Sequence, residues 1–173
     1  WAYETLGDYR FLDVALRTGE FALAAQAPEG YWVHGYRMTV HGIRPATTAN
    51  NIKLQDQVQA HPMLLLAYLH RLTRQSRYLE AVRRAGEFYL RTQNPNGSWS
   101  HHYNLSAKQG RTATDAPGGG ELNDLATNDA IDMMALLYHI TGDARFIQAM
   151  KRCGDWLLAA QGNWDKALGQ FTS

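Results

Sequence analysis

The sequence of 173 residues has little of what marks several common protein classes: one cysteine, five prolines and few charges. A single cysteine excludes an internal disulfide framework, and Cys153 falls on the apolar stripe of an expected helix, which favours burial over reactivity. Charged residues make up 19% of the chain and the formal net charge is +1, so no basic field indicates a nucleic-acid partner. No apolar run is long enough to cross a membrane, and we expect no membrane partner.

Several motifs that identify a chemistry are also missing. The glycines at 118–120 are not followed by the Lys-Ser/Thr pair of a phosphate-binding loop. The chain has no Gly-x-Ser-x-Gly sequence, and its acidic residues do not show EF-hand-like spacing. The function must therefore be sought in a different kind of pattern.

What the chain does contain is a pattern repeated three times. Each copy is an amphipathic stretch that ends in a glutamine and is followed by a turn and a tryptophan. The glutamines, Gln26, Gln93 and Gln161, are 67 and 68 residues apart, and the matching tryptophans are Trp32, Trp99 and Trp164. A period this regular predicts a repeat architecture, and its length predicts a long loop in each unit.

Apolar spacing predicts helices in each copy. Residues 77–93 and 144–161 carry apolar side chains at steps of three and four, so we expect amphipathic outer helices there and in the first copy. Residues 61–72 and 129–140 are apolar nearly all round, which predicts inner helices buried on all sides. Short polar turns join each inner helix to the outer helix that follows it, and Gly142 is expected to end one inner helix.

Long connections lead from each outer helix to the next inner helix, over residues 27–53 and 94–125. Because the helical hairpins repeat in the same orientation, both loops should emerge at one end of the molecule. Loops this long in a compact domain are usually functional. We therefore predict an all-α fold: an (α/α) toroid or partial toroid of helical hairpins, forming one domain over residues 1–173. With only a short stub before the first outer helix, we expect a fragment of a longer chain.

The two loops are rich in side chains that bind sugars and acids. Aromatic faces stack on sugar rings, and arginine pairs with carboxylates, which together predict an acidic carbohydrate as ligand. The candidate substrate-binding residues in the loops are Trp32, Arg37, Trp99, His101 and Arg111. An alternative for Trp32 and Trp99 is a structural role, in which each ring plugs the end of its repeat.

Titratable residues are densest at His101, His102 and Tyr103. A histidine can act as a general base, and a tyrosine can protonate a leaving oxygen. Adjacent histidines diverge in most backbones, so zinc is not expected. Asp56 and Asp129 open the two inner helices; they are either helix caps or functional carboxylates.

Two segments resemble a known family. Residues 77–99, which end in Gln-Asn-Pro-Asn-Gly-Ser-Trp, and residues 127–130, which read Thr-Asn-Asp-Ala, are similar to the family-ten pectate lyases (pectic acid lyases), which are α/α-toroid polysaccharide enzymes. Asp56 stands where that family has an aspartate before an inner helix. Two motifs depart from the family pattern, at residues 56–60 and 99–102, and the catalytic arginine of the family lies in a later segment than this chain contains.

The resemblance implies a secreted or periplasmic lyase that cleaves a uronic-acid polysaccharide such as pectate by β-elimination. The uronate carboxylate would be neutralised by Arg37, Arg111, or a calcium ion held by Asp56 and Asp129. The proton transfers would fall to His102, Tyr103 and Asp129. On this view, Asn128 contacts substrate, while Thr127 and Asn128 together are expected to form a helix N-cap.

Two other functions stay open. Six-hairpin glycoside hydrolases share the architecture, and hydrolysis would need a carboxylate pair, for which Asp56 and Asp129 are the candidates. A helical-repeat module that binds glycan or protein without chemistry is the second alternative.

Overall fold

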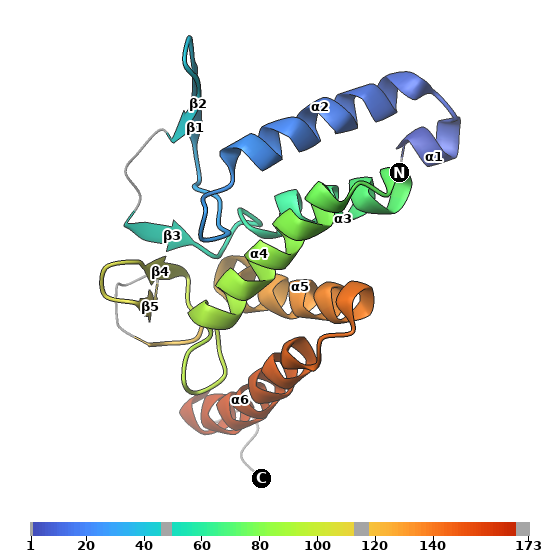
Figure 1. The fold of residues 1–173 in the computed structure, drawn as a ribbon. Helices are drawn as coiled ribbons and strands as arrows, with labels where there is room; N and C mark the ends of the chain where they lie inside the picture. Colours follow the sequence, from blue (N-terminus) through green and yellow to red (C-terminus); the bar gives the residue numbers. More distant parts are fainter. Residues whose placement is uncertain (1, 46–49, 113–117, 169–173) are drawn as a thin grey trace.

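The computed structural model describes residues 2–45, 50–112 and 118–168, with the backbone alone at residue 123 and residues 162–168. The fold is mostly helical with a small sheet at one end (Figure 1). The helices are α1 (Ala2–Leu6), α2 (Tyr9–Ala25), α3 (Ala60–Thr73), α4 (Ser76–Thr92), α5 (Ala126–Thr141) and α6 (Ala144–Leu168), with a short 3-10 turn, η1, at Asn123–Leu125. The strands are β1 (Tyr36–Thr39), β2 (Gly42–Pro45), β3 (Asn51–Lys53), β4 (His102–Asn104) and β5 (Gln109–Arg111).

The predicted hairpins are confirmed. Inner helices α3 and α5 contact each other, while α2, α4 and α6 form a second, outer row beside them. Gly142 ends α5 in the left-handed conformation, with its N–H donating to the Tyr138 carbonyl. Two glycines 67 residues apart, Gly19 and Gly86, let an inner helix approach an outer one closely. A Cβ at these positions would lie 2.2 Å from Leu69 Cδ1 and 2.7 Å from a Leu137 methyl carbon, respectively.

The core lies between the two rows of helices. The outer helix α4 buries Tyr78, Val82, Ala85 and Tyr89, the stripe that its spacing predicts, and Cys153 is fully buried on α6. The inner helices, however, are not buried on all sides: Leu64 is 45% exposed and Tyr138 41% exposed. The prediction that the inner helices are buried on all sides is therefore wrong, although each of them contacts three other helices. The closed toroid and the single-domain organisation of residues 1–173 stay predictions.

The third copy differs from the other two at its end. We expect α6 to stop near Gln161, but it continues to Leu168. In the first two copies, Pro28 and Pro95 stand two residues after the glutamine and prevent helical continuation, whereas the third copy has no proline there. The side chain of Trp164 lies outside the described side chains.

The two long loops emerge at the same end of the molecule, as predicted, and they are joined there by a sheet (Figure 1). Strand β3 of the first loop pairs antiparallel with β4 of the second, and β5 adds to β4. Strands β1 and β2 form a separate hairpin. These strands were not predicted, because segments of three or four residues are too short to show the alternation of apolar and polar side chains.

The repeated glutamines fasten each loop to the next outer helix. Gln26 Nε2 donates to the carbonyls of Gly30 and Ala81, each about 3 Å away. Gln93 makes the matching bonds one repeat later, to the carbonyls of Gly97 and Ala149 at 2.8 Å. Each glutamine also accepts from an arginine through its Oε1: Gln26 from Arg84, and Gln93 from Arg152, the equivalent residue one repeat later.

The repeated tryptophans are structural. Trp32 Nε1 donates to the Ala22 carbonyl at 2.8 Å, and Trp99 Nε1 donates to the Tyr89 carbonyl at 3.0 Å. Trp32 is 3% exposed and Trp99 is fully buried. Trp99 therefore presents no ring face to a sugar, and its predicted stacking role gives way to the alternative that it plugs its repeat. Trp32 makes the same structural contact but also lines a pocket, so a contact of Trp32 with substrate stays a prediction.

Candidate functional site

The candidate site lies where the loops enter the inner helices. Asp56 and Gln57 before α3, and Asp124 and Leu125 before α5, all have left-handed backbones, with φ of 55°, 59°, 48° and 63°. The two pairs are 68 residues apart, so both copies make the same turn. Such conformations cost energy in residues other than glycine and persist where surrounding contacts impose them, often at functional sites.

Hydrogen bonds hold the two turns side by side. The Asp56 N–H donates to the Asp124 carbonyl at 3.0 Å, and the Gln57 N–H donates to Asp129 Oδ2 at 3.0 Å. These contacts bring carboxylates from two copies together. We call Asp56, Gln57, Asp124, Leu125 and Asp129 the paired-turn cluster.

Asp129 occupies a buried position in the first turn of α5, where it is 5% exposed. Burial raises the pKa of Asp129 above its usual range, and the negative charges of Asp132 and Asp56 add to this, while the hydrogen bond from Gln57 opposes it. Asp129 can therefore hold a proton more readily than an ordinary aspartate. Asp129 also affects a neighbour: the pKa of the buried Tyr89 hydroxyl is raised, first by burial and then by the negative charge of Asp129.

Asp56 is in the opposite situation. Its side chain is 44% exposed, and the hydrogen bond from Gln55 Nε2 at 2.9 Å lowers the pKa of Asp56, helped by Lys53 with its Nζ 3.5 Å from Oδ2. Neighbouring carboxylates whose pKa values are pushed apart are the usual arrangement of an acid and an ionised partner.

The predicted N-cap at Thr127 and Asn128 is wrong. Helix α5 begins at Ala126, so both residues lie inside its first turn. The Thr127 hydroxyl is buried and donates to the Glu121 carbonyl at 2.6 Å, while Asn128 is exposed beside Asp129. Asn128 thus keeps a position from which it can contact a ligand.

His101 lies beneath the cluster and not on its surface. It is 5% exposed, with Nδ1 3.1 Å from Glu121 Oε2 and Nε2 3.7 Å from Asp124 Oδ2. This position between two carboxylates suits a residue that orders the turns. The predicted direct contact with substrate does not fit its burial.

The sheet separates the two residues predicted to transfer protons. His102 and Tyr103 are consecutive in β4, so their side chains point to opposite faces of the sheet. Tyr103 packs edge-on against Phe88 of α4, with ring centroids 5.9 Å apart. The structure therefore does not bring His102 and Tyr103 to one sugar.

The sheet instead builds a basic row. His102 is paired in register with Lys53 on one side and Arg111 on the other, and residues directly opposite in a sheet share a face. Lys53, His102 and Arg111 therefore form the basic row beside Asp56. Arg37 lies elsewhere, exposed on β1 opposite Arg44 in the separate hairpin.

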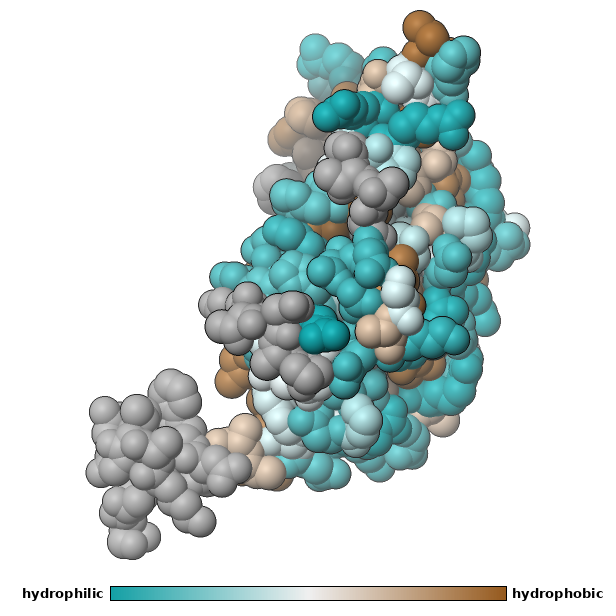
Figure 2. Space-filling model, turned by 90° about the vertical axis from the view of Figure 1, so that its left-hand side faces the viewer, coloured by the Kyte–Doolittle hydropathy of each residue, from teal (hydrophilic) through white to brown (hydrophobic). Residues whose placement is uncertain are grey.

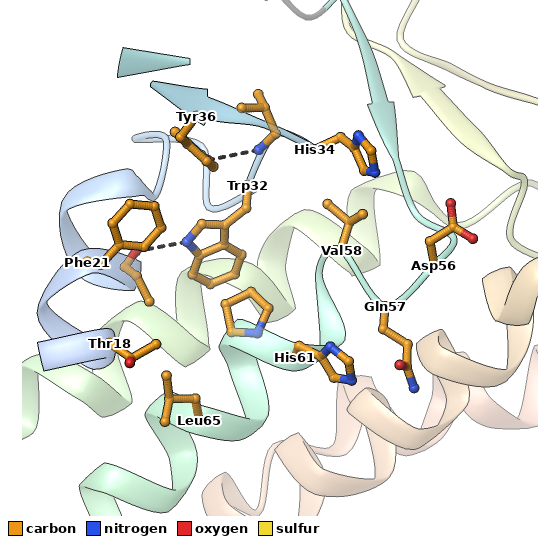
Figure 3. A pocket seen from close by; sticks show the side chains of 13 residues that line it. Thr18, Phe21, Trp32, His34, Tyr36, Asp56, Gln57, Val58, His61 and Leu65 are labelled. Carbon is orange, nitrogen blue, oxygen red and sulfur yellow. Dashed lines mark hydrogen bonds between the residues drawn. The ribbon is translucent and has the colours of Figure 1, made fainter. Parts of the chain in front are cut away.

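A pocket of about 360 Å³ opens beside the cluster, between α2, α3 and the first loop. In Figure 3, Phe21 and Trp32 form an apolar wall, while His34, Asp56 and Gln57 lie on the side away from Phe21. Figure 2, which looks onto the loop end, shows a mainly hydrophilic surface there. An apolar wall with a few converging polar groups is typical of a small-molecule site.

Sequence reasoning missed His61, which lines this pocket and interacts electrostatically with Asp129. It also missed Lys53 and Gln57. The 68-residue period is the signal that could have indicated these three residues. It aligns Lys53, Gln57 and His61 with Glu121, Leu125 and Asp129 of the second copy.

The predicted calcium site is not supported by these contacts. Asp56 is already bonded to Gln55 and paired with Lys53, and Asp129 accepts from Gln57, whereas calcium takes six to eight oxygen ligands. Over the described ranges, no cluster of three or more His, Cys, Asp or Glu residues is arranged to hold a metal ion. Over the same ranges, no helix is long and apolar enough to span a membrane.

Comparison with known proteins supports the resemblance. A family model described as pectic acid lyase matches residues 40–116, which include Asp56 and the whole basic row. No match was found among curated proteins. The fold is similar to a family 10 polysaccharide lyase from Cellvibrio cellulosa, with a TM-score of 0.64 and 19% identity over 85% of this chain and 46% of that one.

A variant of that lyase in complex with trigalaturonic acid aligns with a TM-score of 0.63 and 12% identity, over 87% of this chain and 48% of that one. A family 76 glycoside hydrolase from a bovine Bacteroides thetaiotaomicron strain aligns with a TM-score of 0.55 and 18% identity, over 89% and 31%. The chain thus spans about half the length of the lyases. It resembles the α/α-toroid polysaccharide-processing enzymes, as its sequence predicts.

Proposed function

We propose that this chain forms part of a secreted or periplasmic lyase that cleaves a uronic-acid polysaccharide such as pectate by β-elimination. One observation carries the proposal: the pectic acid lyase match falls on the residues that build the basic row and Asp56. The family 10 lyase complex with trigalaturonic acid supports the class of substrate.

Beta-elimination needs three contributions from the protein. The basic row neutralises the uronate carboxylate, which makes the C5 proton more acidic. His61 accepts that proton, the C4–O bond breaks as a C4–C5 double bond forms, and Asp129 protonates the leaving oxygen. The raised pKa of Asp129 suits the last role, because it keeps a proton available.

A glycoside hydrolase is the alternative, and one observation favours it. Asp56 and Asp129 have pKa values shifted in opposite directions, as an acid and an ionised carboxylate require. The structural similarity to a family 76 glycoside hydrolase agrees with it. Calcium binding at Asp56 and Asp129 stays a separate prediction, which calorimetric titration with calcium chloride tests directly.

The products separate these functions. The full-length protein is incubated with polygalacturonate, and both ultraviolet absorbance and reducing ends are followed. A lyase yields unsaturated ends that absorb, a hydrolase yields reducing ends without absorbance, and a binding module yields neither. If reducing ends form without ultraviolet absorbance, the lyase assignment is wrong and the hydrolase assignment takes its place.

A further inference from the structure

A second pocket lies on the other face of the β3–β5 sheet, against the C-terminal end of α4. Its volume is about 350 Å³, and its lining includes Tyr103 and Gly110, which are paired in register between β4 and β5. Because side chains alternate along a strand, this face is opposite the one that carries the basic row. We call this cavity the outer pocket; it shares no lining residue with the pocket in Figure 3.

The outer pocket is positively charged. Arg91 and Lys108 line it, and among the described lining residues there is no aspartate or glutamate. Among the described residues, Arg91 donates one hydrogen bond, at 2.5 Å to the Glu29 carbonyl, and its guanidinium lies over the Phe88 ring, which fixes its position. That bond uses one of its five N–H donors, so the others can pair with an anion.

Lys108 completes the charge from the β4–β5 connection. It is exposed, and its left-handed backbone, with φ of 50°, makes a tight turn between the strands. Over the described ranges, its ammonium group forms no ion pair within 4.0 Å. An unpaired cation costs little to bring into contact with an anionic ligand, because no existing pair must break.

The remaining groups suit a sugar. Tyr103 is partly exposed, and its ring is held in place by the contact with Phe88. Such an aromatic face stacks on a sugar ring, and the nearby amides of Gln93 and Gln109 add polar groups around it. A phosphate or sulfate ion would use the two cations but would gain nothing from the ring.

We propose that the outer pocket is a second binding site for a carboxylate-bearing sugar, separate from the paired-turn cluster. Arg91 and Lys108 bind the carboxylate, and Tyr103 stacks on the ring. The choice of galacturonate as this sugar rests on the proposed function, whereas the site itself rests on its charge and its aromatic lining. A polymer bound at both faces of the sheet would be retained by two contacts, which strengthens binding without new chemistry.

The test is calorimetric titration of the full-length protein with trigalacturonate, in an Asp129→Asn background to prevent turnover. Two classes of site are expected. Lys108→Gln should weaken one of them roughly threefold to fivefold, as loss of an exposed charge pair does. Lys53→Gln should weaken only the other, and Lys151→Gln, which removes an exposed lysine on α6, is the matched control.

Three results would overturn the proposal: Lys108→Gln behaving like the Lys151→Gln control, the methyl ester of trigalacturonate binding the Lys108 site as tightly as the acid, or inorganic phosphate displacing the acid at equal concentration. The proposed function fails differently, through the absence of unsaturated products with wild-type protein. The two failures can therefore be told apart.

Discussion

The first and second copies of the repeat share their scaffold and differ in their chemistry. Matching glutamines, tryptophans and arginines make the same hydrogen bonds in both copies. The turns before the inner helices also share a left-handed backbone, yet Lys53 and His61 of the first copy correspond to Glu121 and Asp129 of the second. The shared residues build the scaffold and the two turns, including Asp56 and its counterpart Asp124, and the residues that differ give the two copies their different chemistry at the site.

The same comparison explains why a sugar-binding role was predicted for a loop tryptophan that is structural. Trp32 and Trp99 recur at a fixed distance from a glutamine, and this recurrence is the property of a scaffold residue. His61 and Asp129 also occupy equivalent positions, but their chemistry differs, and both contribute to the candidate site. Equivalent positions with unlike side chains are thus the better guide to function here.

Replacing a scaffold residue should have the largest effect. We expect Trp99→Ala to lower the free energy of unfolding by about 3–5 kcal/mol, because it removes a fully buried ring and its hydrogen bond to Tyr89. Denaturant unfolding measures this, with the 71% exposed Leu158→Ala as control. A variant that stays as stable as wild type but binds glycan weakly would restore the stacking role.

Replacing a residue that differs between the copies should spare the fold and affect substrate. Lys53→Gln removes one cation of the basic row, and we expect KM for polygalacturonate to rise about tenfold, the effect of losing a hydrogen bond to a charged group. Steady-state kinetics measure the change, with Lys151→Gln as control. An unchanged KM would remove the basic row from the site.

The shared glutamines should give matched, smaller effects. Gln26→Ala and Gln93→Ala each remove two donated hydrogen bonds and the contact of the glutamine Oε1 with an arginine, so each should cost about 1–2 kcal/mol of unfolding free energy. Thermal or denaturant unfolding of both variants tests the equivalence. Costs that differ by more than twofold would show that the copies are not stabilised alike.

The smallest effect is expected in the pH dependence of folding stability. The folded-state pKa of Asp129 is raised, so its contribution to stability is fully present below its unfolded pKa and is lost as pH rises through the folded value. Asp56, whose pKa is lowered, contributes above its unfolded pKa and loses the contribution as pH falls. Asp129→Asn should therefore remove a decline in stability with rising pH, measured by unfolding across the acidic range. A slope identical to wild type would contradict the shift.

Much of the fold was predictable because helices of 14 to 17 residues show their apolar period clearly. Positions 61–72 and 77–93 match α3 and α4 to within a residue, and Gly142 marks the end of α5. Exposure of the inner helices was not predictable, since the apolar content of Leu64 and its neighbours does not reveal which face finds a partner.

The site was predictable only in part. Asp56 and Asp129 were predicted from their places at the starts of the two inner helices, but the pairing of β3 with β4 depends on contacts between residues about 50 positions apart. That pairing determines which loop residues share a face. With the pairing of β4 and β5, it places Lys53, His102 and Arg111 on one face of the sheet. Tyr103 lies on the other face and lines the outer pocket.

The most direct test of the account is the rate at which unsaturated product forms from polygalacturonate with Asp129→Asn in the full-length protein. Asparagine keeps an oxygen that can accept from the Gln57 N–H but cannot donate an acidic proton. We predict a rate at least about a hundredfold below wild type with no loss of stability near neutral pH, and little change for the exposed neighbour Asp132→Asn. Equal rates for Asp129→Asn and wild type would contradict the assignment of the paired-turn cluster as the active site.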